Sequence, residues 1–333
     1  MSLARPHSMF LALSTTLLAA AIGCGSAAEV PAPGKGSPTD AGGGTDSGSK
    51  PSEQVAADPV ADPVPAELPA LVARALDADV APDLSCAGQP LPTAKGTPTD
   101  REFHLVALGG DDSDRVGGLP IELFYNNDPS KTPDVRATSK KADGDKDKNL
   151  GTFNAPTPSG FLAFHIPKAV GSYETTALDF DTRVDGPLLA TVATDDKVNA
   201  LSLLIGGATW KATPGLARIV VRAVDCAGRP LAGAHVALQV DGVVSAVTTV
   251  QNDPGVRRSY FSDLELPSTA KWSSRSGVAA FLNVPVGKTV KVVVRGKVDA
   301  AGTAAVIAIR EVPFLADGIL TAKITPYSTS LAK

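Results

Sequence analysis

The segment Arg218–Val294 begins RIVVRAVDCAGRPLAGAHVALQVDG and ends SGVAAFLNVPVGKTVKVVV. Two apolar runs rich in valine flank an Asp-Cys-Ala-Gly-Arg-Pro turn, and a long polar loop then leads to Ser276-Gly277 and two further runs. Short runs of β-forming residues separated by turn residues are typical of antiparallel strands. The segment therefore predicts a small antiparallel β-sandwich.

The composition of the whole chain agrees with short strands and tight turns. The chain has 333 residues, of which 43% are hydrophobic and only 5% are aromatic, with 31 glycines and 27 prolines. Valine, leucine, alanine and turn residues therefore have to build the structure, which disfavours a helical protein. The length allows two domains.

A second, weaker copy of the pattern lies upstream. Gly118–Tyr125 aligns with Gly233–Val240, so that alternate apolar side chains share one face in each copy. Ser159-Gly160 aligns in turn with Ser276-Gly277, at nearly the same distance from the first glycine. These matches indicate a duplicated sandwich.

The second copy resembles the carboxypeptidase regulatory-like domain, a transthyretin-like β-sandwich. The resemblance rests on Pro-Leu-Ala-Gly-Ala-x-Val-x-Leu from Pro230 and on Ser-Gly-x-x-x-Phe-x-Asn-Val-Pro-x-Gly from Ser276. It covers residues 218–325 well and residues 103–197 poorly. It implies an all-β protein with two tandem Ig-like or transthyretin-like antiparallel sandwiches.

The expected domain organisation follows from these matches and from the composition. We expect residues 1–23 to form a signal peptide, and a disordered Pro/Gly/Ser linker to follow them. A short helix and pre-domain segment, a divergent first sandwich and the regulatory-like second sandwich complete the chain. The boundaries are 1–23, 24–65, 66–100, 101–213 and 214–330.

The first 24 residues resemble the leader of a bacterial lipoprotein. An apolar stretch too short to span a membrane ends at Ala21-Ile22-Gly23-Cys24, which is similar to a lipobox. The resemblance implies lipidation of Cys24 with acyl chains such as palmitate, a membrane anchor, and a place in the cell envelope, at the outer membrane. Alanine three residues before the cysteine departs from the usual leucine. Ordinary secretion with cleavage after Ser26-Ala27-Ala28 stays open.

The segment after Cys24 reads as a tether. It contains PAPGKGSPTDAGGGTDSGSKPSEQ and the tandem repeat ADPVADPV, which offer too little apolar surface to order a chain. Leu68, Leu71, Val72 and Leu76 then recur at helical spacing, which predicts one short helix within residues 66–77.

Charge is distributed unevenly along the chain. The formal net charge is -4, but residues 25–217 carry a surplus of acidic side chains and residues 218–333 a surplus of basic ones. Ordinary solvated surfaces explain this pattern, and a basic domain that binds an anionic polymer or lipid surface is the alternative. Runs of Lys and Arg interleaved with aromatics are absent from the sequence, which argues against nucleic-acid binding.

The sequence contains no motif for hydrolysis or for a cofactor. The four histidines form neither HExxH nor another zinc-ligand spacing, and the sequence has no Gly-x-Ser-x-Gly. We expect His104, His165 and His235 to be ordinary strand residues, with His235 on a solvent-facing side. The pattern predicts neither an enzyme nor a cofactor.

Two cysteines remain if Cys24 is lipidated. Cys86 lies in Ser-Cys-Ala-Gly-Gln-Pro and Cys226 in Asp-Cys-Ala-Gly-Arg-Pro. The even count allows a disulfide between them, but two free thiols stay equally open because sequence does not show proximity.

Two further loops carry residues that could bind a ligand. Asp143, Asp145 and Asp147 alternate like the start of a calcium loop, but the expected glycine and glutamate are missing, so a solvated loop is favoured over a metal site. The loop after Asp241 carries basic and aromatic residues that could meet a sugar or protein, or could cap the sandwich. These residues are Arg257, Arg258, Tyr260, Phe261, Lys271, Trp272 and Arg275.

Together the sequence predicts an envelope lipoprotein that acts as a non-enzymatic structural or binding module. Its partners would be the membrane, through the lipid anchor, and an envelope protein or polysaccharide. A carbohydrate-binding accessory protein and a secreted hydrolase are the two alternatives.

Overall fold

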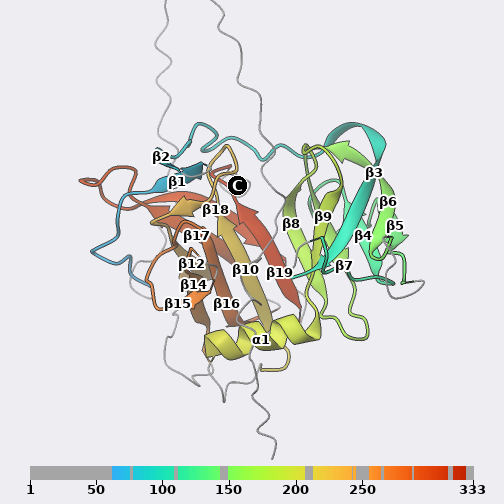
Figure 1. The fold of residues 1–333 in the computed structure, drawn as a ribbon. Helices are drawn as coiled ribbons and strands as arrows, with labels where there is room; N and C mark the ends of the chain where they lie inside the picture. The colour runs from blue at the N-terminus through green and yellow to red at the C-terminus, as the bar shows by residue number, and fades with distance from the viewer. Residues whose placement is uncertain are drawn as a thin grey trace, which may run out of the picture.

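The computed structural model describes residues 62–75, 78–108, 112–142, 149–206, 213–241, 243–244, 255–263, 266–286, 289–313 and 318–327. Within these ranges the chain forms nineteen strands and one helix (Figure 1). The predicted all-β class is confirmed. No helix among the described residues is long and apolar enough to cross a membrane.

The first sandwich consists of two sheets that face each other. Its outer sheet has the order β6-β3-β9, and its inner sheet has the order β5-β4-β7-β8. Phe103, Leu123 and Phe164 are among the buried side chains between them. The strands are β3 (Lys95–Ala107), β4 (Pro120–Phe124), β5 (Val135–Thr138), β6 (Thr152–Ser159), β7 (Phe161–Ile166), β8 (Thr175–Asp181) and β9 (Leu188–Val192).

The second sandwich repeats this plan. Strands in the order β15-β14-β16-β10-β19 face a sheet of order β13-β12-β17-β18, and Val236, Phe281 and Val292 lie in the core between them. The strands are β10 (Ala217–Ala223), β12 (His235–Val240), β13 (Val243–Val244), β14 (Arg257–Phe261), β15 (Pro267–Ser268), β16 (Val278–Val284), β17 (Val290–Gly296), β18 (Ala305–Val312) and β19 (Ile319–Ile324).

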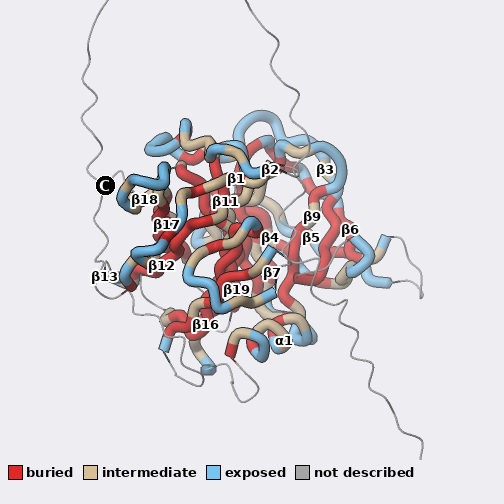
Figure 2. Tube along the Cα trace, turned by 60° about the vertical axis from the view of Figure 1, so that its left-hand side comes forward, coloured by how far each residue is buried: buried red, intermediate tan, exposed pale blue. Residues whose placement is uncertain are grey.

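The two sandwiches share one nine-stranded sheet, which the sequence did not reveal. β8 of the first sandwich pairs in parallel with β19 of the second, with Thr175 opposite Ile319 and Leu178 opposite Ala322. Buried residues continue through β16, β19, β7 and β4 across the middle of the molecule (Figure 2). The chain is therefore built as two joined sandwiches rather than two separate ones.

Strand pairing supports the duplication but corrects its alignment. In the first copy β3 pairs with β6 and β9, and in the second copy β10 pairs in the same way with β16 and β19. Likewise, β4 pairs with β7 in the first copy, and β12 pairs with β17 in the second. Gly118 and Gly233 precede equivalent strands and share a φ near +79°. The match of Ser159-Gly160 with Ser276-Gly277 is wrong, because the strands that follow, β7 and β16, hold different positions in the two copies.

The predicted short helix is also wrong. Residues 72–75 form β1 (Val72–Ala75), which pairs with β2 (Ala78–Val80) and β11 (Leu231–Ala232), in place of the predicted helix. Leu68 and Leu71 are buried against the second sandwich, which accounts for their helix-like spacing without a helix. The one helix of the described residues is α1 (Asp195–Gly206), which lies between β9 and β10 in the chain. β1 and α1 lie at opposite ends of the molecule (Figure 1).

Candidate functional site

The basic and aromatic residues predicted to line one loop lie mostly in a strand. Arg257, Arg258, Tyr260 and Phe261 belong to β14, which lies between the edge strand β15 and β16 in the second sandwich. Tyr260 and Phe261 are 1% and 2% exposed, so the prediction that they face a ligand is wrong. Capping of the sandwich is the better description, since alternate side chains of a strand pack into the cores on both sides of its sheet.

The remaining basic residues contact the chain's own N-terminal segment. We call residues 62–80 the strap, because this segment runs across the second sandwich and pairs with it through β1 and β11. Lys271 binds Glu67 with 2.7 Å between Nζ and Oε1, and Arg275 binds Asp79 with 2.7 Å between Nη2 and Oδ2. The acidic strap thus neutralises part of the basic surplus of the second half of the chain.

Backbone contacts fix the path of the strap. The Leu71 N–H donates to the Lys297 carbonyl at 2.7 Å, and the Arg74 N–H donates to the Pro230 carbonyl at 3.0 Å. A Cβ on Gly233 would lie 2.9 Å from the Ala70 oxygen, so glycine lets the strap approach closely.

The strap begins at a buried carboxylate, Asp62, which is 4% exposed. Arg258 Nη1 donates to Asp62 Oδ2 at 2.6 Å and to the Val236 carbonyl at 2.7 Å, while Arg295 Nη1 donates to the Asp62 carbonyl at 3.1 Å. His235 Nε2 lies 3.5 Å from Asp62 Oδ1, too far for a good hydrogen bond but close enough for an electrostatic contact. We call the set formed by Arg258, Arg295 and His235 the Asp62 pocket.

Burial and charge act against each other in the Asp62 pocket. Burial alone would raise the pKa of Asp62, but its contacts with His235 and Arg258 prevail and lower that pKa. Burial is the largest influence on His235 and, with the nearby Arg258 and Arg295, it lowers the pKa of the imidazole despite the Asp62 carboxylate. His235 is fully buried, so its predicted contact with solvent is wrong.

Tyr260 packs against the Asp62 pocket. Its hydroxyl accepts a hydrogen bond from the Val236 N–H at 2.8 Å, and its ring lies under the Arg258 guanidinium at 5.2 Å. Burial raises the pKa of the Tyr260 hydroxyl to about 12, which keeps it protonated at neutral pH. The phenol therefore serves to orient Arg258 and the β12 backbone.

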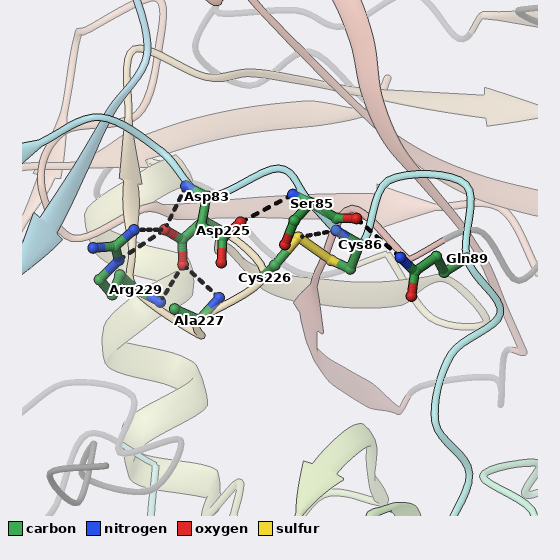
Figure 3. Close-up of a disulfide and its surroundings, with 8 residues drawn as sticks. All are labelled: Asp83, Ser85, Cys86, Gln89, Asp225, Cys226, Ala227 and Arg229. Carbon is green, nitrogen blue, oxygen red and sulfur yellow. Dashed lines mark hydrogen bonds and ion pairs between the residues drawn. A yellow bond between two sulfur atoms is a disulfide. The ribbon is translucent and has the colours of Figure 1, made fainter. Parts of the chain in front are cut away.

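A disulfide joins Cys86 to Cys226 and ties the segment after the strap to the second sandwich (Figure 3). Of the two alternatives left open by the sequence, the bridge is the one present. The two turns also bond to each other, since the Cys226 N–H donates to the Asp83 carbonyl at 2.9 Å.

Asp225, which is fully buried, organises the turn beside the bridge. Its carboxylate accepts from the N–H groups of Asp83, Ala227 and Arg229 and from the Arg229 guanidinium (Figure 3). The Asp-Cys-Ala-Gly-Arg sequence is therefore explained by folding of the turn and by its union with the segment around Cys86.

The other two described histidines pair with carboxylates. His104 contacts Asp112 at 2.6 Å and Glu102 at 3.1 Å, and His165 contacts Glu122 and Glu174 at 3.1 and 2.9 Å. Among the described residues no group of His, Cys, Asp or Glu is arranged to hold a metal ion.

Several predicted site residues stand apart from this region. Arg257 donates to the Gly206 carbonyl at 2.8 Å and so satisfies the C-terminus of α1, and Trp272 is half-buried. Cys24 and the calcium candidates Asp143, Asp145 and Asp147 lie outside the described residues. Lipidation and the weaker calcium alternative therefore stay predictions.

Sequence reasoning missed Asp62, Glu67 and Asp79, the acidic partners of the basic cluster. One signal was available, because Asp62 belongs to the tandem ADPVADPV repeat and precedes a proline that favours extended backbone. Chemically, the region binds a carboxylate and an extended acidic segment, and the segment it holds in this structure is its own.

Comparison with known proteins gives little further guidance. No protein-family model matches the chain, and no curated protein matches it. Among solved structures, the Bacillus anthracis TIE protein is 11% identical with a TM-score of 0.20, over 68% of this chain and 34% of that one, so this chain spans about a third of its length. The shaft pilin spaA from Lactobacillus rhamnosus GG is 11% identical with a TM-score of 0.20, over 69% of this chain and 97% of that one. The major pilin from Streptococcus pyogenes is 9% identical with a TM-score of 0.17, over 69% and 98%. These similarities are too slight to assign this chain to any of those kinds of protein.

Proposed function

We propose that this protein is a non-enzymatic structural module of the cell envelope, held by a lipid on Cys24 and carried on the tether that ends at the strap. The observation that carries the proposal is the strap itself. The charged groups that the sequence offered as a ligand surface, Arg258, Lys271 and Arg275, each bind an acidic residue of the strap.

The strap would also allow the folded part of the chain to bear a force applied through the tether. A force applied through the tether would act first on the ion pair of the buried Asp62. It would then act on the pairing of β1 with β11. The disulfide behind β1 would take the remaining load, and such bridges persist in oxidising compartments outside the cytosol. Force would thus enter the second sandwich and pass through the shared sheet to the first.

The anchor is tested by replacing Cys24 with serine in the full-length protein. We expect wild-type protein to incorporate a labelled fatty acid and to remain with the membrane fraction, and Cys24→Ser to lose both properties. Equal acyl labelling of the two proteins would refute the anchor.

The structural role is tested on the intact mature chain by a broad screen for hydrolase activity. We expect no turnover above that of a heat-denatured sample. Robust turnover that survives further purification would replace this proposal with the hydrolase alternative.

The carbohydrate alternative depended on the rings of Tyr260, Phe261 and Trp272. Tyr260 and Phe261 are buried, which removes two of these three rings from contact with a sugar.

A further inference from the structure

His165 contacts two carboxylates, one through each ring nitrogen. Its Nδ1 lies 3.1 Å from Glu122 Oε2, and its Nε2 lies 2.9 Å from Glu174 Oε1. An ionised carboxylate can only accept a hydrogen bond, and a neutral imidazole has a single N–H to donate. Both hydrogen bonds therefore form together only when the His165 ring is protonated on both nitrogens.

The neighbouring charged groups treat the two carboxylates differently. Arg136 of β5 donates to Glu122 Oε1 at 2.9 Å, whereas among the described residues the Glu174 side chain bonds to His165 alone. Burial would raise the pKa of Glu122, but its contacts with Arg136 and His165 prevail and lower that pKa. Glu122 is therefore ionised at neutral pH, and Glu174 is the carboxylate that depends on the His165 ring.

Glu174 lies where the sheet shared by the two sandwiches begins. Its carbonyl accepts a hydrogen bond from the Ile319 N–H at 2.8 Å, beside the position where Thr175 lies opposite Ile319. Ile319 is the first residue of β19, the strand of the second sandwich that pairs with β8. Glu174 thus contacts His165 through its side chain and the second sandwich through its backbone.

We propose that His165 is a pH-dependent clasp on the junction between the two sandwiches. The protonated ring holds Glu122 and Glu174 together and keeps the Glu174 carbonyl in place for β19. Glu122 is fixed directly opposite His165 by the pairing of β4 with β7 and by Arg136, so a neutral ring releases Glu174. The start of the β8–β19 pairing is then held more firmly in mildly acidic than in alkaline solution, a regulation that goes beyond the proposed structural role.

The test follows hydrogen exchange of the Ile319 amide in the full mature chain with the disulfide formed. The measurements are made at pH 6 and pH 8.5, both above the range in which carboxyl groups ordinarily titrate. After correction for the intrinsic effect of pH, we expect Ile319 to open roughly fivefold more often at pH 8.5, the effect of losing one partly buried charged hydrogen bond. His165→Gln should remove this difference and leave the exchange of Leu71 in the strap as in wild type.

Two further variants separate the clasp from general loss of stability. His104→Gln is the matched control, because His104 also contacts two carboxylates, Asp112 and Glu102, but both belong to the first sandwich. It should keep the wild-type pH dependence at Ile319. Glu174→Gln provides an amide that can donate to a neutral ring, so it should protect Ile319 at pH 8.5 better than wild type does. The proposal is overturned if Ile319 opens equally often at both pH values in wild type, or if the difference survives His165→Gln.

Discussion

At the scale of single residues, the shifted pKa values of His235 and Asp62 link the stability of the fold to pH. His235 has a pKa below its ordinary value of 6.5, because burial and two arginines disfavour the charged ring. A group whose folded pKa is lowered stabilises the fold above its unfolded pKa and loses that contribution as the pH falls. The lowered pKa of Asp62 acts in the same direction, but only below its ordinary value of 3.8.

We therefore predict that the fold is less stable at pH 5 than at pH 7, and that His235 is responsible. Amide exchange of Leu71, corrected for the intrinsic effect of pH, should show more frequent opening at pH 5. His235→Gln should flatten this dependence, while the matched variant His165→Gln should keep it, because His165 lies in the first sandwich. An unchanged pH profile in His235→Gln would contradict the assignment.

At the scale of elements, the fit between the strap and β11 depends on Gly233. Gly233 and Gly228 both have a φ near +79°, but a Cβ on Gly233 would lie 2.9 Å from the Ala70 oxygen, whereas one on Gly228 would meet nothing within 4 Å. Alanine at either position should cost about 1 to 2 kcal/mol from the left-handed backbone. Gly233→Ala should cost a further 1 to 3 kcal/mol or so, because the strap must move.

Urea denaturation of the two alanine variants measures this difference, and exchange of the strap amides locates it. Gly228→Ala serves as the control for backbone strain alone. Equal losses of stability in the two variants would show that the strap does not depend on close approach at Gly233.

The disulfide is the second element that holds the segment behind the strap. Cys86 and Cys226 are 140 residues apart, so in the loop-entropy model the bridge contributes roughly 4 to 5 kcal/mol to the free energy of unfolding. We predict that Cys86→Ser/Cys226→Ser loses a large part of this in urea denaturation without reductant. Wild type with reductant is the matched control and should approach the double variant. A loss below about 1 kcal/mol would mean that the strap contacts suffice.

Much of this element-scale structure could be predicted from sequence. The strands around Val236 and Phe281 were expected, because alternating apolar residues between glycine and proline turns specify local geometry. The strap was not expected, because the apolar residues between 68 and 76 have helical spacing. The extended backbone depends on contacts with Lys297 and Pro230, which are distant in sequence. The basic cluster was identified, but its partners lie about 200 positions away in sequence, and pairing over such separations leaves no local pattern.

At the scale of the whole molecule, the shared sheet joins the two sandwiches into one unit. Beside the β8–β19 pairing, Phe124, Ala163 and Leu178 of the first sandwich pack into the core cluster of the second. Such continuous burial predicts that the two sandwiches unfold together, although duplicated domains often unfold separately.

A buried polar contact crosses the same junction. Asp179 of β8 is 1% exposed, bonds to Asn127 and accepts from Arg310 Nε of β18 at 3.1 Å. Asp179 and Asn127 both adopt a left-handed backbone, with φ of 57° and 58°. Sterically costly conformations persist where surrounding contacts enforce them, and here the contacts come from both sandwiches.

We predict that Asp179→Ala destabilises the whole molecule, by about 3 kcal/mol, because Arg310 loses a buried carboxylate partner. Calorimetry of wild type should show one transition, and the variant should show one transition at a midpoint lower by about 6 to 12 °C. Asp181→Ala is the matched control: it lies in the same strand, but its partner Arg183 belongs to the same sandwich and is half-exposed, so its loss should cost about 1 kcal/mol or less. Two transitions in wild type, of which only one moves in Asp179→Ala, would show that the sandwiches unfold independently and that the junction transmits little force between them.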